Sequence, residues 1–487
     1  MKLPFDLNRK EDFLVKAMIV IGDNLIDFIP CKVYLPERNY EKPYLLFESK
    51  SDTAEKLITS EKGPFRFVKG DVTIEASEIY FSGFSSKSCD GDISDTTFLG
   101  EPQDLHIIVQ MPSMNVDNRT HIVFWISPNR LLTPKIWLVP LDTGEVFRKD
   151  IQDLSFIIEN NLKFAFDKRF NYKKEKNGDV TRWSFLVASA SIIDISATDA
   201  NAVKNGVLQK IDDFLLLASF ASKKRTACLG WSAIDRHVHT KFYRGYYSFP
   251  KPDDSEENED GIIDDRYFKI FMEVSYPLFL SVNNKEAFRR VLHAAVPSKN
   301  RTLESSFLNM FAGLESLVLD FRRRNSFEFI LQEPSWTSFK DYLEKCIKSS
   351  TKPIIEKEQR RLIYSKLNEL NRVSLKEAFD AFCKHYSVGL TDLWPIFAEN
   401  RESVGLSDIR NKLIHGDPFP SRLIEPLSVA CEHMEYVLQR MIIRILDWSI
   451  DKTNLKPNIL NARYNSIKDL PQAMKELSMF IKSEESY

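Results

Sequence analysis

The chain has 487 residues, and its 67 Lys and Arg nearly balance 69 Asp and Glu, giving a net charge of −2. At ~150 residues per domain this length excludes a single small module, and an apolar content of 43% is enough for substantial cores. The near-neutral charge excludes a general attraction to nucleic acid or to an anionic membrane, so any polyanion has to be bound at a local site.

Up to about residue 195, short apolar segments alternate with turn residues, which is typical of β-strands. The segment 122–126 is apolar on both faces, as expected for a strand that is covered on both sides. The pattern predicts a β-rich domain with a sandwich-like or barrel-like core, with strands at residues 32–35, 44–47, 72–76, 106–109, 121–127, 136–139 and 162–166.

A helical period begins near Asp199. Apolar residues recur at three- and four-residue steps from Val203 to Ala218, which predicts one amphipathic helix near 200–223. The basic residues 223–225 suit the C-terminal end of its dipole, and a nucleic-acid role is the alternative for the same charges.

The acidic patch at residues 253–261, which follows an aromatic-rich extended stretch at 241–249, predicts a solvated linker. Beyond it, apolar stripes at helical spacing run from Leu303 to Phe321 and from Leu427 to Ile445, and weaker helical patterns occupy residues 339–347, 358–370 and 375–385. We therefore predict a multidomain α+β chain, with a β-rich domain at residues 1–250 and an α-helical bundle at residues 262–487.

The sequence gives no sign of a metal, a cofactor or a membrane span. The six cysteines are scattered, and the phosphate-loop, dinucleotide, zinc-protease and α/β-hydrolase motifs are absent. His237 and His239 lack a nearby ligand cluster, so we interpret them as surface or structural residues. Without a secretory signal or an apolar run near ~20 residues, a cytoplasmic protein is expected.

The segment 406–418 combines a short amphipathic helix with a charged tip. Its apolar residues share one face with Leu406, and the Gly-Asp-Pro sequence at 416–418 is expected to stop the helix directly after His415. On a helical wheel, Asn411 and His415 fall about 140° and 180° from Leu406. His415 is therefore expected to point away from the core of its own bundle.

Arg410, Asn411 and His415 supply the groups that cleave RNA without a metal. An imidazole titrating near ~6.5 moves protons at neutral pH. A guanidinium binds two phosphate oxygens at once, and an amide orients either group. The alternative is structural, with His415 capping the helix C-terminus and Arg410 in a surface ion pair.

The string Arg410-Asn411-Lys412-Leu413-Ile414-His415-Gly416 resembles the R-x(4–6)-H signature of HEPN ribonucleases, which occur in toxins and antiviral effectors. A β-rich half followed by a helical half with this motif near its end resembles the ApeA-type HEPN proteins of bacterial anti-phage defence. The resemblance implies an endoribonuclease of abortive infection that leaves a 2′,3′-cyclic phosphate. It assigns proton transfer to His415, charge stabilisation to Arg410 and phosphate positioning to Asn411.

One helix cannot readily present Arg410 and His415 to the same phosphate, because five positions on a regular helix separate them by ~140° and ~7.5 Å. A second copy across a two-fold axis would complete the site, as the resemblance to dimeric HEPN nucleases also implies. We therefore expect a homodimer or a larger even assembly with an RNA substrate, in which the β-rich domain senses a phage-derived ligand or protein.

Two other functions fit the same residues. A catalytically silent scaffold would dimerise and present the β-rich domain to a partner, with Arg410 and His415 serving as structural caps. An antitoxin that neutralises a nucleotidyltransferase is the third, because some HEPN proteins pair with such partners.

Overall fold

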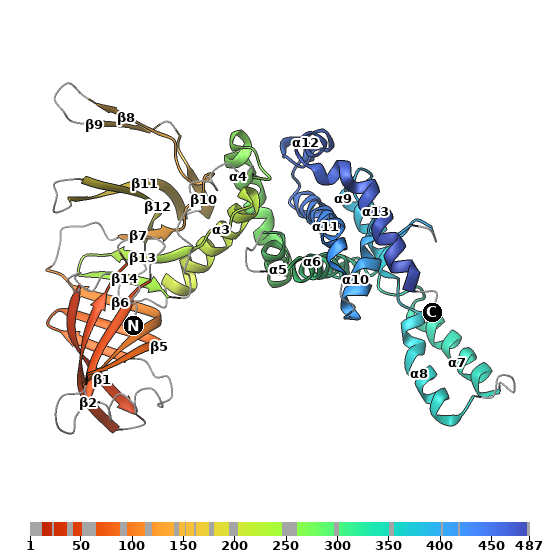
Figure 1. Ribbon diagram of the computed structural model, residues 1–487, viewed down its shortest axis with the longest axis horizontal. Helices are drawn as coiled ribbons and strands as arrows, with labels where there is room; N and C mark the ends of the chain where they lie inside the picture. Colours follow the sequence, from red (N-terminus) through yellow and green to blue (C-terminus); the bar gives the residue numbers. More distant parts are fainter. Residues whose placement is uncertain are drawn as a thin grey trace. The chain divides into compact units, whose positions relative to one another are not determined.

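The computed structural model describes most of the chain, namely residues 12–21, 24–36, 42–50, 65–87, 95–112, 119–140, 146–150, 152–159, 162–174, 180–193, 203–245, 261–296, 301–349, 355–400, 403–416 and 419–484. It divides into two compact units, Met1–Gly261 with Phe268–Glu273 and Ile262–Tyr267 with Val274–Tyr487. The first unit is built mainly of strands and the second of helices, so the chain is α+β as predicted (Figure 1). Residues 268–273, placed in the helical domain by the sequence, group with the first unit.

An antiparallel sheet of 12 strands forms most of the described part of the first unit. In sheet order these are β10 (Ser155–Glu159), β11 (Leu162–Lys174), β12 (Val180–Ile193), β7 (Arg119–Ile126), β13 (Cys228–Ile234), β14 (Val238–Arg244), β6 (Asp95–Gln110), β3 (Tyr44–Lys50), β2 (Asn24–Tyr34), β1 (Phe13–Ile21), β4 (Phe65–Lys69) and β5 (Val72–Lys87). Two further strands, β8 (Ile136–Pro140) and β9 (Val146–Asp150), pair separately. All seven predicted strand segments lie in strands, apart from a terminal residue or two.

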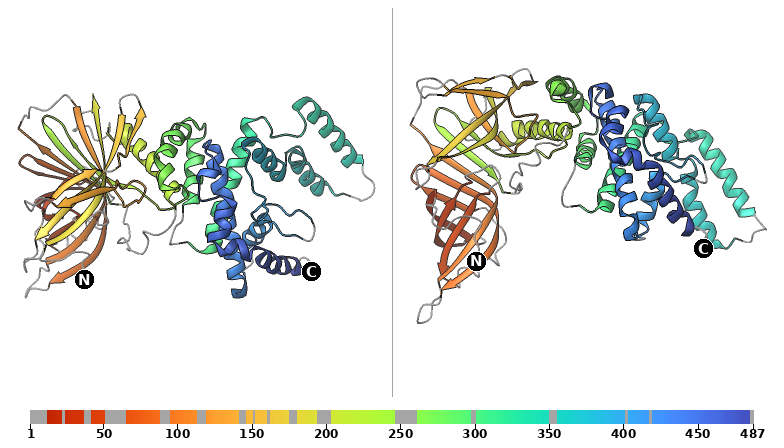
Figure 2. Two further views of the ribbon diagram at one scale, coloured as in Figure 1. Left: turned by 90° about the horizontal axis from the view of Figure 1, so that it is seen from above. Right: turned by 45° about the horizontal axis from the view of Figure 1, so that its top comes forward.

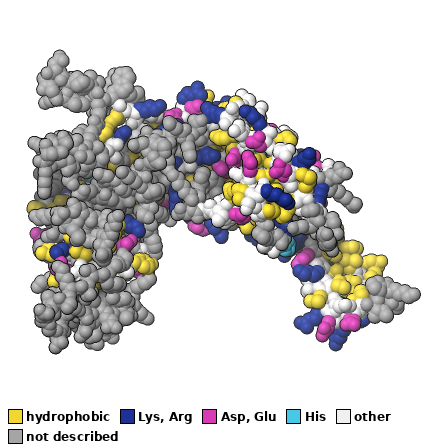
Figure 3. Space-filling model, in the orientation of Figure 1, with side chains coloured by type: hydrophobic (Ala, Val, Ile, Leu, Met, Phe, Trp, Pro, Cys, Tyr) yellow, Lys and Arg dark blue, Asp and Glu magenta, His cyan; other side chains and the backbone are white. Residues whose placement is uncertain are grey.

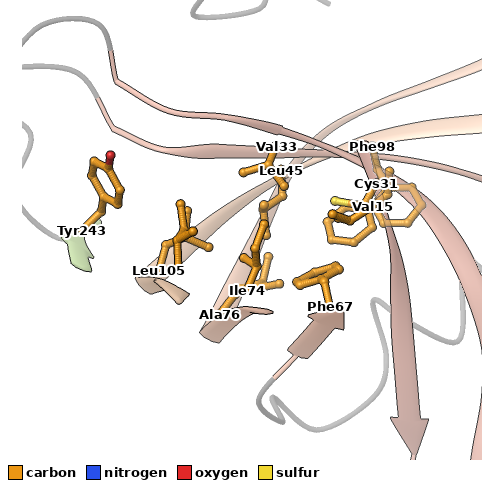
Figure 4. Close-up of a cluster of buried hydrophobic side chains, with 13 residues drawn as sticks. Val15, Cys31, Val33, Leu45, Phe67, Ile74, Ala76, Phe98, Leu105 and Tyr243 are labelled. Atoms are coloured by element: carbon orange, nitrogen blue, oxygen red, sulfur yellow. The ribbon is translucent and has the colours of Figure 1, made fainter. Parts of the chain in front are cut away.

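A ring of six strands closes at one end of this sheet, because β5 also pairs with β6. Along its other edge, β6 pairs with β3 through residues 95–100 and with β14 through residues 104–110. Side chains from every strand of the ring meet in one buried cluster (Figure 4), including Val15, Cys31, Leu45, Phe67, Ile74 and Phe98. The ring corresponds to the barrel-like alternative of the prediction.

Helix α3 (Gln209–Ser222) lies beside the remaining strands of the sheet (Figure 2) and follows a π-helical turn, Lys204–Leu208. Phe214 packs on Phe156 and Phe166 with ring centroids 4.9 and 5.5 Å apart. The expected amphipathic character is wrong, since all residues from 213 to 222 are buried. The reason is that α3 packs against side chains of β10, β11 and β13 instead of facing water on one side.

Two details of the first unit refine the sequence analysis. In β7, Ile122, Phe124 and Ile126 are fully buried, whereas Val123 and Trp125 are partly exposed, so only one face is completely covered. The basic residues 223–225 follow the end of α3 directly, as predicted. The predicted linker lies outside the described residues except for its last residue, 261, and so do residues 246–249 of the aromatic stretch.

The second unit is a helical bundle around α11. Its described helices are α4 (Asp265–Ser281), of which residues 268–273 group with the first unit, α5 (Lys285–Ala295), α6 (Leu303–Arg324), α7 (Glu333–Ser349), α8 (Lys357–Leu370), α9 (Leu375–Tyr386), α10 (Leu406–Ile414), α11 (Ile424–Ile445), α12 (Pro457–Arg463) and α13 (Asn465–Glu484). Helix α11 packs on α5, α6, α9 and α13. Both predicted stripes are buried except for Leu303 and Ile445, which are partly exposed. Within the described ranges, no helix has the length and apolar character required to span a membrane.

Candidate functional site

Helix α10, which carries the predicted site, is fixed at its N-terminus by backbone contacts. The N–H of Leu406 donates to the carbonyl of Pro395 at 3.0 Å, and the N–H of Gly405 donates to the carboxylate of Asp408 at 2.9 Å. A Cβ at Gly405 would lie 2.6 Å from the carbonyl oxygen of Ile396, so glycine is required for this close approach. The start of α10 is thereby tied to the loop before it.

The two ends of α10 differ in burial. Leu406 and Ile409 are fully buried, whereas Leu413, expected on the same face, is partly exposed near the helix end. The helix ends at Ile414, and Gly416 follows in the left-handed region with φ +79°. The predicted stop at the glycine is thus confirmed, while residues 417–418 lie outside the described part of the chain.

Arg410 packs between α10 and α6. Its Nη2 lies 3.1 and 3.4 Å from the two carboxylate oxygens of Glu315, and its guanidinium carbon lies 5.8 Å from the ring centre of Phe311. Its Nη1 donates to Oδ1 of Asn411 at 3.1 Å. The side chains of Arg410 and Glu315 are 30% and 26% exposed. Two of the three predicted residues are therefore in direct contact, and one side of the pair is open to solvent.

The guanidinium of Arg410 keeps donors for a ligand. It carries five N–H groups, and the bonds to Asn411 and Glu315 use one on each terminal nitrogen. The Nε–H and one N–H on each terminal nitrogen have no acceptor within the described part of the chain. Because Asn411 accepts through its oxygen, its amide nitrogen keeps both donors, and the residue is exposed. Such charged and neutral donors are suited to phosphate oxygens.

His415 is exposed at the end of α10. Its backbone N–H donates to the carbonyl of Asn411 at 3.1 Å, but its imidazole has no hydrogen-bond partner in the part of the chain that the structure describes. The imidazole therefore does not cover the last carbonyls of the helix, as the structural cap requires. It is accessible for proton transfer.

Three consecutive arginines in the last turn of α6, residues 322–324, have local partners. Arg322 donates to the carbonyl of Val373 at 2.8 Å, and Arg323 and Arg324 form ion pairs with Glu328 and Asp320. The arginine run is therefore a helix end with neighbours that engage its charges.

His237 lies between β13 and β14, and His239 lies on β14. His239 is half-buried, its Nε2 lies 2.8 Å from Oγ of Ser232, and burial together with Lys241 lowers its pKa. His237 is exposed. Among the described residues, no group of three or more His, Cys, Asp or Glu side chains is arranged to hold a metal ion.

Sequence reasoning missed Glu315 and Phe311, because they precede Arg410 by more than ninety residues and only packing of α6 on α10 brings them together. It also missed His433, whose signal was its position within the apolar stripe of α11. Nδ1 of His433 accepts the N–H of Trp394 at 3.2 Å, and burial lowers its pKa.

No protein-family model, no curated protein and no solved structure matches this chain. The likeness to HEPN ribonucleases therefore stays a resemblance carried by residues 410–416.

Proposed function

We propose that the protein is a metal-independent RNA endonuclease of the HEPN type, acting in the cytoplasm in abortive antiviral defence. One observation supports this best: Arg410 and Asn411 are joined by a hydrogen bond, with donors left over, and an accessible imidazole ends the same helix. None of the three side chains is sealed inside the protomer.

In the proposed reaction the 2′-oxygen of RNA attacks the adjacent phosphorus, and the bond from phosphorus to the 5′-oxygen breaks. The 2′-hydroxyl loses a proton and the departing 5′-oxygen gains one, and His415 serves one of these transfers, a contribution of ~10²- to 10⁴-fold. The remaining donors of Arg410 stabilise charge on the non-bridging oxygens, and the amide nitrogen of Asn411 holds one of them. The products are a 2′,3′-cyclic phosphate and a 5′-hydroxyl.

The proposed active form is a homodimer. Arg410 packs towards α6, whereas His415 lies at the exposed tip of α10, so two copies facing each other across this helix would pair one chain's imidazole with the other's guanidinium. Ile414, directly before His415, is 53% exposed and offers apolar surface for that contact. The β-rich unit would then act as the sensor of a phage-derived ligand or protein.

The silent scaffold stays the second candidate, because the ion pair with Glu315 gives Arg410 a structural partner. In that function the motif would hold α10 on α6 and cleave nothing. The exposed imidazole of His415, which no described residue hydrogen-bonds, has no part in such a role.

The experiment that separates the two candidates is His415→Ala in the full chain. The nuclease proposal expects cleavage of single-stranded RNA to fall by ~10²- to 10⁴-fold, with 2′,3′-cyclic ends in the wild-type products and an unchanged melting temperature. His237→Ala removes another exposed histidine and serves as the matched control. No cleavage by either protein would favour the scaffold, whereas equal cleavage by His415→Ala and wild type would contradict the assignment of proton transfer to His415.

A further inference from the structure

Helices α7 and α8 form a hairpin that carries a large apolar surface. The hydroxyl of Tyr364 contacts the carbonyl of Glu344 at 3.4 Å, and the N–H of Ile330 donates to the carbonyl of Asn371 at 2.8 Å, which places the segment before α7 beside the end of α8. Hydrophobic side chains gather over these helices in Figure 3. We define the hairpin surface by six residues that are 45–68% exposed: Phe329, Ile330, Phe339, Tyr342, Leu362 and Leu370.

The size of the hairpin surface is that of a protein interface. At about 180 Å² for a fully exposed large side chain, the six exposed fractions amount to roughly 600 Å² of apolar area. The largest apolar patch on an ordinary monomer is ~300–600 Å². One partner in a stable complex contributes ~800 Å² in total, which the hairpin surface and its polar rim can supply.

Helices α7 and α8 bury few of their own side chains within the protomer. Within the protomer, Trp336 is the buried residue of α7 and Leu367 that of α8, whereas α6 buries eight residues. Helices of this length owe most of their stability to packing of an apolar face. Among the residues that the structure describes, the apolar faces of α7 and α8 are thus left without a covering layer.

We infer that the hairpin surface is a self-association interface, in which the α7–α8 hairpins of two copies pair about a two-fold axis as a four-helix bundle. Two hairpins with the same apolar face are self-complementary under two-fold symmetry, and this is how helical hairpins complete a core. The inference goes beyond the proposed nuclease function and uses different helices from α10.

The charge of the hairpin favours a second copy over RNA as the occupant. Helix α7 carries three acidic and three basic side chains, and α8 carries two acidic and four basic ones. Together they have seven basic against five acidic groups, a net charge of +2. Such a nearly neutral surface opposes self-association only weakly, whereas a single-stranded RNA platform combines its aromatic residues with concentrated positive charge.

The test is the mass of the full chain in solution, measured by light scattering, with Tyr342→Glu/Leu362→Glu against wild type. These two positions are 63% and 68% exposed in the protomer, so the double variant should keep its fold and its mass should be half that of wild type. Ile157→Glu, at a position 78% exposed on β10, is the matched control and should keep the wild-type mass. If α10 does not pair, the double variant converts a dimer into a monomer. If α10 joins two such dimers, the double variant converts a tetramer into a dimer, so the mass is halved in both cases.

Cys346 provides a second measurement that needs no change to the surface. It is an exposed thiol on α7, one turn beyond Tyr342, whereas Cys31, Cys228 and Cys431 are buried. Labelling of Cys346 by a maleimide should slow as protein concentration rises, with Cys346→Ser defining the background. A rate independent of concentration, or equal masses for wild type and the double variant, overturns the inference.

Binding of single-stranded RNA is the competing role for the hairpin surface. If the double variant keeps the wild-type mass but loses binding to a labelled single-stranded oligonucleotide, the hairpin surface is an RNA platform and the inference fails. The double variant retains Arg410 and His415, so failure of the nuclease proposal would show in cleavage assays and not in mass.

Discussion

Two arginine–carboxylate pairs of the helical unit differ in how completely the guanidinium is used. Arg440, only 3% exposed, donates through both terminal nitrogens to Asp392 at 2.6 and 2.7 Å, and also to the carbonyls of Gly389 and Leu455. Its five N–H groups make five hydrogen bonds. Arg410 is 30% exposed, and its bonds to Glu315 and Asn411 use two of the five donors.

The comparison separates a structural arginine from an available one. A guanidinium with every donor engaged inside the protein has nothing left for a substrate, and removing it leaves buried acceptors unpaired. A guanidinium with three donors left at a solvent-exposed edge can bind a ligand without losing its own anchor. If the difference is real, substitutions at the two arginines should have opposite effects on stability and on activity.

Arg440→Met should cause the largest loss of stability. It leaves Asp392 and the carbonyls of Gly389 and Leu455 without their donor, and breaking such a buried pair costs about 3–5 kcal/mol of unfolding free energy. Urea denaturation measures the loss. Arg422→Met, at an exposed arginine, should stay within about 0.5 kcal/mol of wild type. A wild-type midpoint for Arg440→Met would contradict the structural role.

Arg410→Ala should have the opposite profile, with activity lost and the fold kept. Loss of a donor that stabilises transition-state charge lowers the rate by about 10²- to 10³-fold, whereas a half-exposed ion pair contributes about 0–1 kcal/mol to stability. Initial rates of RNA cleavage and urea midpoints measure the two effects. A large drop in the midpoint with cleavage unchanged would assign Arg410 to the structural class.

Glu315→Gln should alter RNA affinity more than stability. The glutamine oxygen can still accept from Arg410, but the negative charge beside the bound phosphate is removed. A unit charge at about 4 Å in bulk water is worth about 1 kcal/mol, so KM for RNA should fall about fivefold. Glu315→Asp keeps the charge and should keep KM near the wild-type value. A higher KM for Glu315→Gln would show that the carboxylate is needed for positioning.

His433 should give the smallest effect, a pH dependence of stability. Burial lowers its pKa, and its Nδ1 accepts the N–H of Trp394, so the folded protein holds it neutral while the unfolded chain protonates it near ~6.5. The contribution of neutral His433 to the free energy of unfolding is therefore complete above that pH. It is lost as the pH falls from about 7 towards the lowered pKa. Melting temperatures from pH 7 to 5 should fall less steeply in His433→Gln than in wild type, and equal slopes for the two proteins would contradict the prediction.

Local sequence patterns predicted much of the fold and part of the site. Strand alternation, the apolar stripes of α6 and α11 and the stop of α10 before Gly416 follow from neighbours in sequence, and the structure confirms them. The closure of β5 on β6 and the burial of α3 on all sides depend on partners distant in the chain, which periodicity does not reveal.

The site shows the same division. Arg410, Asn411 and His415 were selected because they are close in sequence and chemically suited to phosphate, and the structure brings the first two into contact. Whether they cleave RNA is a prediction for the assays above. Glu315 could not be predicted, because nothing in the sequence of α6 distinguishes a carboxylate that contacts an arginine from one that faces solvent.

The shared strand β6 has a consequence for how the first unit unfolds. Its first residues belong to the closed ring and its last ones to the open sheet, while β5 runs along both. Neither the closed ring nor the open part of the sheet can therefore open completely without disturbing the β5–β6 hydrogen bonds that both share. We expect the amides of β6 to exchange with solvent only through the global transition of this unit, and both halves to melt in a single cooperative step.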